Sequence, residues 1–590
     1  MLNFLAIPLS RSSAVRRVPE RFLAPILWIF IFALLVIRLP LGVDLRDEAF
    51  DFSHILDWMR NGFSSSPNLN IRQTSALLLY PLAVLYVKIM GGLDGILLYM
   101  RAWVIVMAML ASVAFYDFLR NLRPLRTAAL SSAIFFAFIP WAFLVPEYDN
   151  MGMYGFVTAL SLLGSATLLG ASNPKATLWS QPSLMLRLIG SSICWVFSII
   201  SYPPLVISFV VFGVVVLFWL PLESRRRIAV FYVICCITAF SMGTCLLIAV
   251  FGFERIRLMY EFTASTYQLV VGVPDRFATS LGYLSRGPIF SALLVATAFL
   301  AVVCAIWRNQ AVTFWACLCV TALVAACVPL TPVLFETSND ISLLLGIFSF
   351  YLIFRPEETT LRSGMVRVFV MTCLVSGLVY SWAAGMGLLN VAYGVSAAAC
   401  LGLALIVPDQ TNINARLRYA HQVLLVFILG LACASTLLVV EGYDPKWPDD
   451  LQRVETGLFR GLYTTPAQKT YIANVQRAFA EVSGPGHTVT VFGDAGLYLL
   501  TDMAPRALST WNYELRSGTV AARMVFEYFA EPSNQADFIV IDTPRQLSET
   551  VTNLLKNYRL LTRGKVGSDG FMLYRRMDHP GGQSPLGGSD

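Results

Sequence analysis

The sequence has little charge for its length. Only 13% of its 590 residues are charged, against roughly a quarter in soluble domains. Lys and Arg form no basic patch interleaved with aromatic residues, so a nucleic-acid partner receives no support. No glycine-rich loop carries the lysine of a phosphate-binding loop, so the sequence does not indicate a nucleotide-driven pump. The 57% hydrophobic content instead indicates a protein that crosses a membrane many times.

Histidine is also scarce, and cysteine occurs only in apolar surroundings. The four histidines are widely separated, and all eleven cysteines fall in apolar runs. No pair of cysteines has zinc-ligand spacing together with polar neighbours. The cysteines are therefore interpreted as small hydrophobic residues, and neither a disulfide framework nor a His- or Cys-based metal site is predicted.

The apolar runs predict about thirteen membrane spans, each of roughly 20 residues. Short loops rich in Lys and Arg follow alternate spans, which predicts a cytoplasmic N-terminus and, with an odd span count, an outer C-terminal region. The expected location is the bacterial inner membrane, with the C-terminal region in the periplasm. The predicted spans lie at about 22–40, 97–119, 127–145, 151–170, 188–201, 204–221, 228–251, 288–306, 311–330, 341–354, 366–386, 391–407 and 420–440.

Three segments need separate treatment. Residues 75–92 are apolar, but counting them as a span would place the basic loop at 120–126 outside, so we predict an interfacial or re-entrant segment. Residues 202–204, Tyr-Pro-Pro, are either a turn between two spans or a kink. The outer loop 41–74 contains an apolar pattern that suits an amphipathic helix lying on the membrane surface.

The composition changes after residue 440. Helical patterns alternate with short apolar strands over 441–576, which predicts a small α/β domain. The sequence Gly493-Asp494-Ala495-Gly496 follows one strand and is interpreted as a turn. The tail 577–590 is predicted to be disordered. The predicted helices are 449–461, 466–482, 519–530 and 544–555, and the predicted strands are 488–492, 537–542, 558–561 and 571–574.

Two acidic clusters lie in consecutive outer loops. The first has four carboxylates in eight residues: Asp44, Asp47, Glu48 and Asp51. Carboxylates beside a bilayer are costly unless they have a function there. Asp44 and Asp51 can also be explained as loop polarity or helix capping. The second cluster, Glu147-Tyr148-Asp149, comes before the fourth predicted span and is expected on the same face of the membrane.

The motif Asp47-Glu48-Ala49-Phe50 after the first span resembles the Asp-Glu motif of polytopic GT-C glycosyltransferases. This superfamily includes aminoarabinose-to-lipid-A transferases, protein O-mannosyltransferases and arabinofuranosyltransferases. The resemblance implies a helical GT-C-like membrane domain at 1–440, an extracytoplasmic C-terminal α/β domain, and a sugar donor linked to polyprenyl phosphate. Leu79-Tyr80-Pro81-Leu82 only partly follows the family's next segment, and the family's later basic residue has no clear counterpart here.

The chemistry predicted for this site is transfer of a sugar to a glycan, lipid or protein acceptor. A carboxylate at a membrane edge can have a raised pKa and act as a general base, and Asp47 is the candidate. Glu48 and Asp149 complete the predicted catalytic set, with Asp149 orienting the acceptor or holding a divalent cation, Mg²⁺ or Mn²⁺, whose need stays open. The resemblance implies inversion at the sugar. The remaining candidates, for substrate and for the lipid phosphate, are Asp44, Glu147, Tyr148, Arg255, Arg257, Arg276 and Arg286.

Three other interpretations compete with the enzyme. A transporter or flippase would place ionisable groups near the middle of the spans, where this sequence has few. An O-antigen ligase or polymerase would have its key groups in a large later loop. In the third, the C-terminal domain is a binding module and the spans are its scaffold. Truncation after residue 440 should distinguish this interpretation from the enzyme, because the Asp47 site of an enzyme is expected to remain intact.

Overall fold

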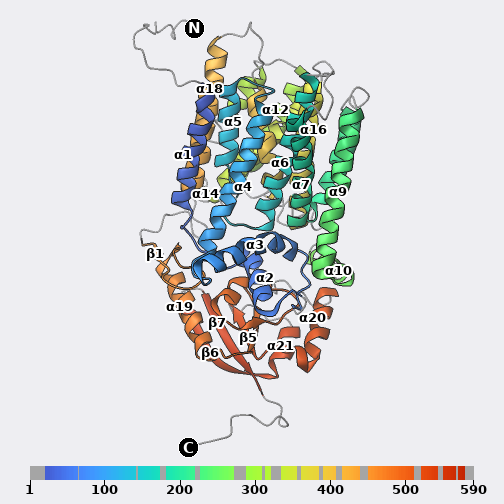
Figure 1. Cartoon of the computed structure of the whole chain (residues 1–590). Coiled ribbons are helices and arrows are strands. Elements are labelled where there is room, and N and C mark those ends of the chain that lie inside the picture. Colours follow the sequence, from blue (N-terminus) through green and yellow to red (C-terminus); the bar gives the residue numbers. More distant parts are fainter. Residues whose placement is uncertain are drawn as a thin grey trace, which may run out of the picture.

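Long helices run between two ends of an elongated bundle, and a smaller domain with a sheet covers one of these ends (Figure 1). The structure is a computed structural model. It describes residues 20–63, 66–140, 144–172, 181–219, 226–270, 288–307, 312–319, 334–354, 361–384, 390–406, 415–438, 450–510, 520–542, 549–566 and 569–577.

The bundle helices agree with twelve of the predicted spans in position, whereas most of the predicted span 311–330 lies outside the described residues. Within the described part of the chain, eight helices are long and apolar enough to cross a membrane, and the protein is a multi-pass membrane protein. Tyr-Pro-Pro at 202–204 separates two of the helices. The bundle helices are α1 (Leu23–Arg38), α4 (Ile96–Leu119), α5 (Leu125–Ala137), α6 (Tyr148–Ser172), α7 (Pro182–Ser201), α8 (Leu205–Trp219), α9 (Arg226–Phe251), α12 (Pro288–Trp307), α14 (Leu334–Phe348), α15 (Tyr351–Phe354), α16 (Leu361–Ala384), α17 (Val391–Leu405) and α18 (Ala415–Leu438).

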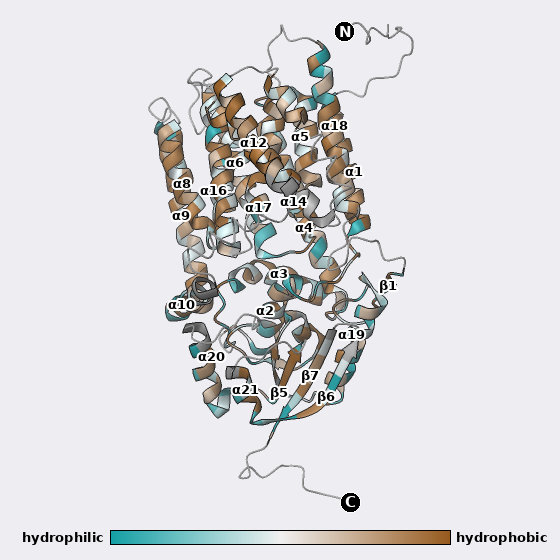
Figure 2. Cartoon of the chain, turned by 180° about the vertical axis from the view of Figure 1, so that it is seen from behind, coloured by the Kyte–Doolittle hydropathy of each residue, from teal (hydrophilic) through white to brown (hydrophobic). Residues whose placement is uncertain are grey.

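The two ends of the bundle differ: one carries the basic loop 120–126, and the C-terminal domain covers the other (Figure 1). At one end Arg126 pairs with Glu20 over 4.0 Å, and Arg123 Nη2 donates to the carbonyl of Leu405 at 3.1 Å. The C-terminal domain lies at the opposite end (Figure 1). The bundle is mostly hydrophobic along its length, and hydrophilic residues are more frequent in the domain (Figure 2). The helices therefore place the 120–126 loop and the C-terminal domain at opposite ends, as the predicted span order requires.

Three helices lie where the bundle meets the C-terminal domain: α2 (Asp47–Asn61), α3 (Gln73–Met90) and α10 (Phe253–Val270). Although α3 is long and apolar enough to span a membrane, it lies across this end of the bundle (Figure 1), as expected of an interfacial segment. The prediction for α2 was wrong in its environment. Residues 48–58 of α2 are buried on every face, because the C-terminal domain covers the side that was expected to face lipid headgroups or water.

The C-terminal domain is built on a five-stranded mixed sheet with the strand order β4-β3-β5-β7-β6. Strand β3 is parallel to β4 and β5, whereas β7 is antiparallel to both β5 and β6. All four predicted strands form, and β6 and β7 extend beyond the predicted bounds. The strands are β3 (Thr488–Phe492), β4 (Ala504–Pro505), β5 (Phe538–Asp542), β6 (Tyr558–Val566) and β7 (Asp569–Arg576).

The predicted helices of this domain have mixed outcomes. Three correspond to α19 (Pro466–Ala480), α20 (Val520–Ala530) and α21 (Glu549–Leu555). The prediction of a helix at 449–461 was wrong. The chain there forms β1 (Gln452–Arg453), which pairs with β2 (Tyr463–Thr464), and Gly457 and Gly461 between them have positive φ angles of 75° and 91°. Glycine adopts such angles without strain, and a helix does not use them.

Helices α16 and α17 approach so closely that only glycine fits between them. A Cβ atom on Gly394 would overlap the backbone nitrogen and Cα of Gly377. Small residues allow such close helix contacts in membrane proteins, where van der Waals packing drives association.

We expect Gly394→Ala to lower the stability of the bundle by about 1–3 kcal/mol, because the added methyl group must push two backbones apart. The measurement is thermal unfolding of the detergent-purified protein. The matched control is Gly430→Ala on α18, where a Cβ meets nothing within 4 Å. Equal melting temperatures for the two variants would contradict the prediction.

Candidate functional site

The first acidic cluster forms the N-terminal turn of α2. The Asp44 carboxylate accepts hydrogen bonds from the backbone amides of Arg46, Asp47 and Glu48 at 2.9, 2.8 and 3.0 Å. These amides would otherwise have no partner at a helix start. The capping interpretation of Asp44 is therefore confirmed, and its predicted contact with substrate stays a prediction.

Asp47 is the first residue of α2 and is half-buried. Burial raises the pKa of its carboxyl to about 7, and the negative charge of Asp44 acts in the same direction. The charges of Arg72 and Arg46 oppose the shift, and Asp494 in the C-terminal domain adds to it. A carboxyl group with a pKa near neutrality can exchange a proton at physiological pH, which is what a general base needs.

Asp51 lies one helical turn beyond Asp47 on α2 and is fully buried, with 2% of its surface exposed. One carboxylate oxygen accepts a hydrogen bond from the Ser75 hydroxyl at 2.6 Å. The other has no hydrogen-bond partner within the described residues. Burial raises the pKa of Asp51 to about 7, against the Ser75 hydrogen bond and the charge of Arg72. The sequence prediction of loop polarity or capping was wrong about this environment.

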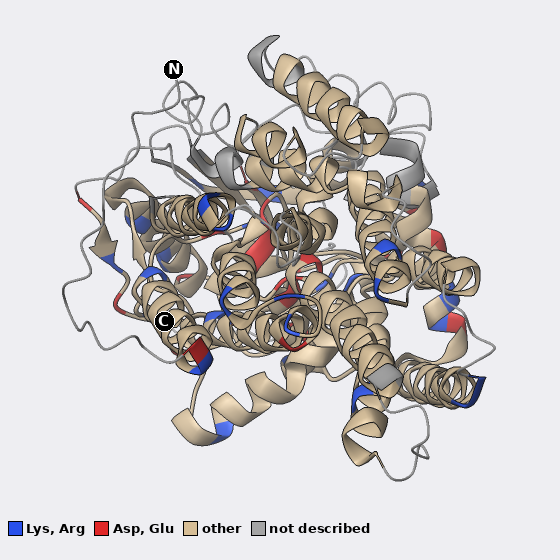
Figure 3. Ribbon diagram, turned by 90° about the horizontal axis from the view of Figure 1, so that it is seen from above, with Lys and Arg blue, Asp and Glu red and all other residues tan. Residues whose placement is uncertain are grey.

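The second acidic cluster opens α6 and meets the first. Asp149 is buried, with 5% of its surface exposed, and its Oδ1 has no hydrogen-bond partner within the described residues. Its charge interacts with those of Arg72, Asp47 and Asp51. In the view along the bundle, acidic positions gather towards the middle of the projection (Figure 3). The structure thus brings the two predicted acidic loops together at one end of the bundle.

Arg72, just before α3, supplies the positive charge at this cluster, and the sequence prediction missed it. The residue is buried, with 8% exposed. Its Nη1 donates to the Tyr148 hydroxyl at 2.6 Å, and its guanidinium lies 4.4 Å from the centre of the Tyr148 ring. Its charge acts on Asp47, Asp51 and Asp149. The sequence did contain a signal for this role, because Arg72 lies in the same outer loop as the acidic motif, directly after the polar segment 66–70.

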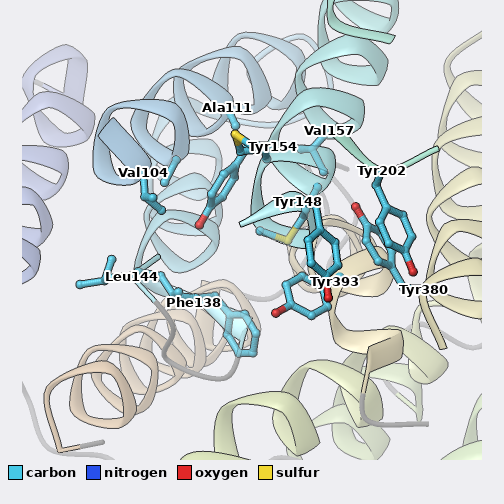
Figure 4. Packing of buried hydrophobic residues seen from close by; sticks show 14 of the residues in the cluster. Val104, Ala111, Phe138, Leu144, Tyr148, Tyr154, Val157, Tyr202, Tyr380 and Tyr393 are labelled. Atoms are coloured by element: carbon cyan, nitrogen blue, oxygen red, sulfur yellow. The ribbon is translucent and has the colours of Figure 1, made fainter. Parts of the chain in front are cut away.

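Four tyrosines in contact with one another support the second cluster from the bundle side (Figure 4). Tyr148 stacks on Tyr202 at 5.7 Å and 9°, and Tyr202 stacks on Tyr380 at 4.6 Å and 12°. Tyr380 packs next to Tyr393 at 5.3 Å. The Tyr393 hydroxyl donates to Glu147 at 3.0 Å. Helices α6, α16 and α17 are thus tied to the residues around Asp149, which restricts its movement.

Glu48 forms a buried ion pair with Arg101 of α4. Arg101 Nε and Nη2 each donate to one Glu48 oxygen at 2.6 Å. Burial raises the pKa of Glu48, and the charge of Arg101 opposes that shift. The same guanidinium donates to the carbonyls of Leu39, Leu41 and Gly42. The pair therefore anchors the loop that leads from α1 into α2.

The predicted arginines occupy three kinds of position. Arg255 on α10 donates to the carbonyls of Phe63 and Asn68 at 2.7 and 3.2 Å, so it holds the segment after α2. Arg257 is 58% exposed and pairs with Glu254 and Glu261 of its own helix. Arg276 and Arg286 lie outside the described residues.

The carboxylates of the two acidic clusters are the candidate ligands for a divalent cation. Within the described part of the chain, no group of three or more His, Cys, Asp and Glu side chains lies close enough to hold a metal ion. Asp47, Asp51 and Asp149 instead share the charge of Arg72.

The C-terminal domain holds the part of the chain that follows these carboxylates. Arg60 near the end of α2 donates to the carbonyls of Thr501 and Met503 at 2.8 and 3.0 Å. Further on, the Leu69 amide donates to the Leu508 carbonyl at 2.7 Å. Truncation after residue 440 would remove these contacts, so the structure gives a reason to expect that it disturbs the Asp47 site.

No known protein family and no curated protein matches this chain in sequence. Its fold is similar to the archaeal oligosaccharyltransferase AglB from Archaeoglobus fulgidus in complex with an inhibitory peptide and a dolichol-phosphate, with a TM-score of 0.46, 11% identity, and coverage of 94% of this chain and 74% of that one. The apo form of the A. fulgidus enzyme gives a TM-score of 0.48, 12% identity and coverages of 90% and 70%. Its complex with Zn and sulfate gives a TM-score of 0.45 and 13% identity, with coverage of 88% of this chain and 68% of that one. At these identities and TM-scores, no role of these proteins is assigned to this chain.

Proposed function

We propose that this protein is a membrane glycosyltransferase that moves a sugar from a polyprenyl-phosphate donor to a hydroxyl group of a glycan, lipid or protein acceptor. The observation that carries the proposal is the half-buried Asp47, with a pKa of about 7, beside the buried Arg72 at the end of the bundle that the C-terminal domain covers (Figure 1). The pair offers a base for the acceptor and a cation for a leaving phosphate at one place.

In the proposed reaction Asp47 takes the proton of the acceptor hydroxyl. The acceptor oxygen attacks the anomeric carbon, and the bond from that carbon to the phosphate oxygen breaks with its electron pair. Polyprenyl phosphate leaves carrying the added negative charge, which Arg72 stabilises through charge-assisted hydrogen bonds. Direct displacement of this kind inverts the configuration at the anomeric carbon.

The other carboxylates have supporting parts in this proposal. Asp149, with a buried oxygen that has no partner within the described residues, accepts a hydrogen bond from the acceptor and orients it. Asp51 packs one helical turn below Asp47 and adds to the charge around Arg72. Glu48, whose oxygens both bind Arg101, holds the loop in place and takes no part in proton transfer.

The arrangement also supports a proposed topology. The membrane domain would be 1–440, the outer domain 441–576 and the tail 577–590, with the active site and the outer domain on the extracytoplasmic side of a bacterial inner membrane. Lipid-linked donors suit that side because they carry an activated sugar without a nucleotide. The basic loop 120–126 would then face the cytoplasm, as the positive-inside rule expects.

The test is transfer of a radiolabelled sugar from extracted polyprenyl-phosphate donors in membranes that contain the protein. The expected result is a labelled acceptor and free polyprenyl phosphate in equal amounts. Membranes from cells without the protein are the control. If no lipid donor supported transfer and the donor moved across the bilayer instead, the protein would be a flippase and the proposed enzyme activity would be rejected.

We expect transfer to fall as the pH drops below about 7, because Asp47 must be ionised to accept a proton. Asp44 and Asp494 raise its pKa together with burial, and Arg72 and Arg46 lower it. Well below the pKa, kcat/KM should decrease about tenfold per pH unit, as for any single essential base. The measurement is kcat/KM between pH 5 and 9, over which a phosphodiester donor does not titrate. A flat profile from pH 5 to 8 would contradict the assignment.

A further inference from the structure

The loop that carries the acidic motif is held by the C-terminal domain at successive residues. The Gly42 amide donates to the Tyr463 carbonyl at 2.9 Å. The Gln468 side chain donates to the Val43 carbonyl at 3.0 Å. Further along, the Gly496 amide donates to the Leu45 carbonyl at 2.6 Å. A Cβ on Gly496 would meet the Leu45 Cα and carbonyl oxygen at 2.7 Å, so the close approach requires glycine at this position.

Arg46, the next residue of the loop, binds a carboxylate of the same domain. Its Nε donates to Asp494 Oδ1 at 3.0 Å. The Arg46 side chain is 59% exposed and that of Asp494 is 15% exposed. Asp44 caps the same turn and interacts electrostatically with Asp494. The charge of Arg46 therefore lies between carboxylates from two domains, directly beside Asp47 in sequence.

Asp494 itself is fixed by the sheet. It follows β3, and Asp542 ends the neighbouring parallel strand β5. The carboxyl ends of adjacent parallel strands form the edge at which α/β domains place functional groups. Asp542 accepts a hydrogen bond from the Tyr471 hydroxyl at 2.6 Å, and a Cβ on Gly493 would overlap Asp542. This packing leaves Asp494 little freedom to move away from Arg46.

We propose that the C-terminal domain is a working part of the active site, in which Asp494 is a positioning residue that holds Arg46 and, through it, the turn carrying Asp47. This proposal rests on the proposed glycosyl transfer at Asp47. The charged groups around Asp47 are Asp44, Arg46, Arg72 and Asp494, together with Asp51 and Asp149. Arg46 and Asp494 form the contact between the domains. The turn of the Gly493–Gly496 segment thereby acquires a function.

The experiment compares Asp494→Asn, Arg46→Gln and the double variant in the sugar-transfer assay. Each single variant should lower kcat about tenfold with the donor KM nearly unchanged. The double variant should be no slower than the singles, because residues in one contact do not act additively. Asp494→Glu should recover most of the activity. Asp502→Asn is the control, since Asp502 is a fully exposed carboxylate of the same domain that pairs with Arg60 at 3.7 Å.

The pH profile separates positioning from loss of folded protein. Arg46 lowers the pKa of Asp47, so Arg46→Gln should move the acid limb to higher pH by about half a unit, as expected for one partly screened charge. A purely structural defect would lower kcat without moving the limb. Additive losses in the double variant, or activity of Asp494→Asn equal to that of Asp502→Asn, would overturn the proposal.

Hydrogen exchange gives a second readout that needs no activity. In Asp494→Asn the backbone amides of Arg46, Asp47 and Glu48 should exchange faster than in the wild type, whereas Asp502→Asn should leave them unchanged. If the wild type transfers no sugar, the proposed function fails, and exchange still decides whether Asp494 holds the loop. If the wild type is active and exchange in Asp494→Asn is unchanged, the positioning role alone is overturned.

Discussion

Replacing Asp47 with Asn is expected to reduce sugar transfer by about 10²–10⁴-fold, the usual contribution of a positioned general base. The amide has nearly the shape of the carboxylic acid, so the packing at the start of α2 should be kept. It cannot accept the acceptor's proton at any accessible pH, however. The measurement is initial-rate transfer from a polyprenyl-phosphate donor with the amount of folded protein matched. The residual activity should also lose the acid limb near pH 7.

A control on the same helix distinguishes loss of the base from damage to α2. Asp57 is buried in α2 and accepts a hydrogen bond from Asn61 at 2.7 Å. Burial raises its pKa, and the hydrogen bonds of Ser66 and Asn61 and the charges of Arg255 and Arg60 lower it. Asn keeps the shape of the side chain and an oxygen that can accept the hydrogen bond from Asn61. Asp57→Asn should keep most of the transfer activity and the acid limb. Equal transfer by wild type and Asp47→Asn would remove Asp47 from the reaction, even if the protein proved to be a glycosyltransferase.

The helical layout of this chain could be predicted because it follows from local properties. Apolar runs and alternating basic loops indicate the spans and their order, since they report how each segment partitions between lipid and water. The prediction that α3 is interfacial came from the Arg residues of the loop at 120–126. The strands β3 and β5 were equally clear because nearly all of their residues are β-branched or aromatic, and such residues favour strands.

Which residues come together at the site depends on contacts between distant parts of the chain, and local sequence patterns do not show such contacts. The sequence indicated Asp47 and Asp149, but it did not indicate that Arg72 would lie with them. Arg72 meets Tyr148, 76 residues away on α6, and its charge acts on Asp47 and Asp51 of α2. Asp51 was interpreted as a surface group because nothing local shows that a second domain covers α2. Glu48 was assigned to catalysis for the same reason, since its partner Arg101 lies 53 residues away in the chain.

The helix predicted at 449–461 failed because of backbone geometry. The segment has the polar and apolar spacing of a helix, but Gly457 and Gly461 both have positive φ angles. Gly457 also contacts the membrane domain, since its carbonyl accepts a hydrogen bond from the Gly95 amide at 3.0 Å. A contact between domains therefore decided a local structure that propensity alone assigned differently.

Breaking the buried pair of Glu48 and Arg101 should have the largest effect on stability. Arg101→Met is expected to cost about 3–5 kcal/mol, the usual result of leaving one buried charge without its partner. The Glu48 and Arg101 side chains are 0% and 2% exposed, so water cannot replace the lost contacts. The carbonyls of Leu39, Leu41 and Gly42 lose a donor in the same step. Thermal unfolding in detergent measures the change.

Glu48→Gln provides the sharper comparison, because its amide oxygen can still accept from Arg101 while its charge is gone. We expect a smaller loss of stability than for Arg101→Met, together with an acid limb of transfer that stays near pH 7. Arg101→Lys should not restore stability, since an ammonium group cannot reproduce the fork that reaches both Glu48 oxygens and three carbonyls. If Glu48→Gln instead abolished transfer and the acid limb while leaving the melting temperature unchanged, Glu48 would be the base, and its pair with Arg101 would have to open during the reaction.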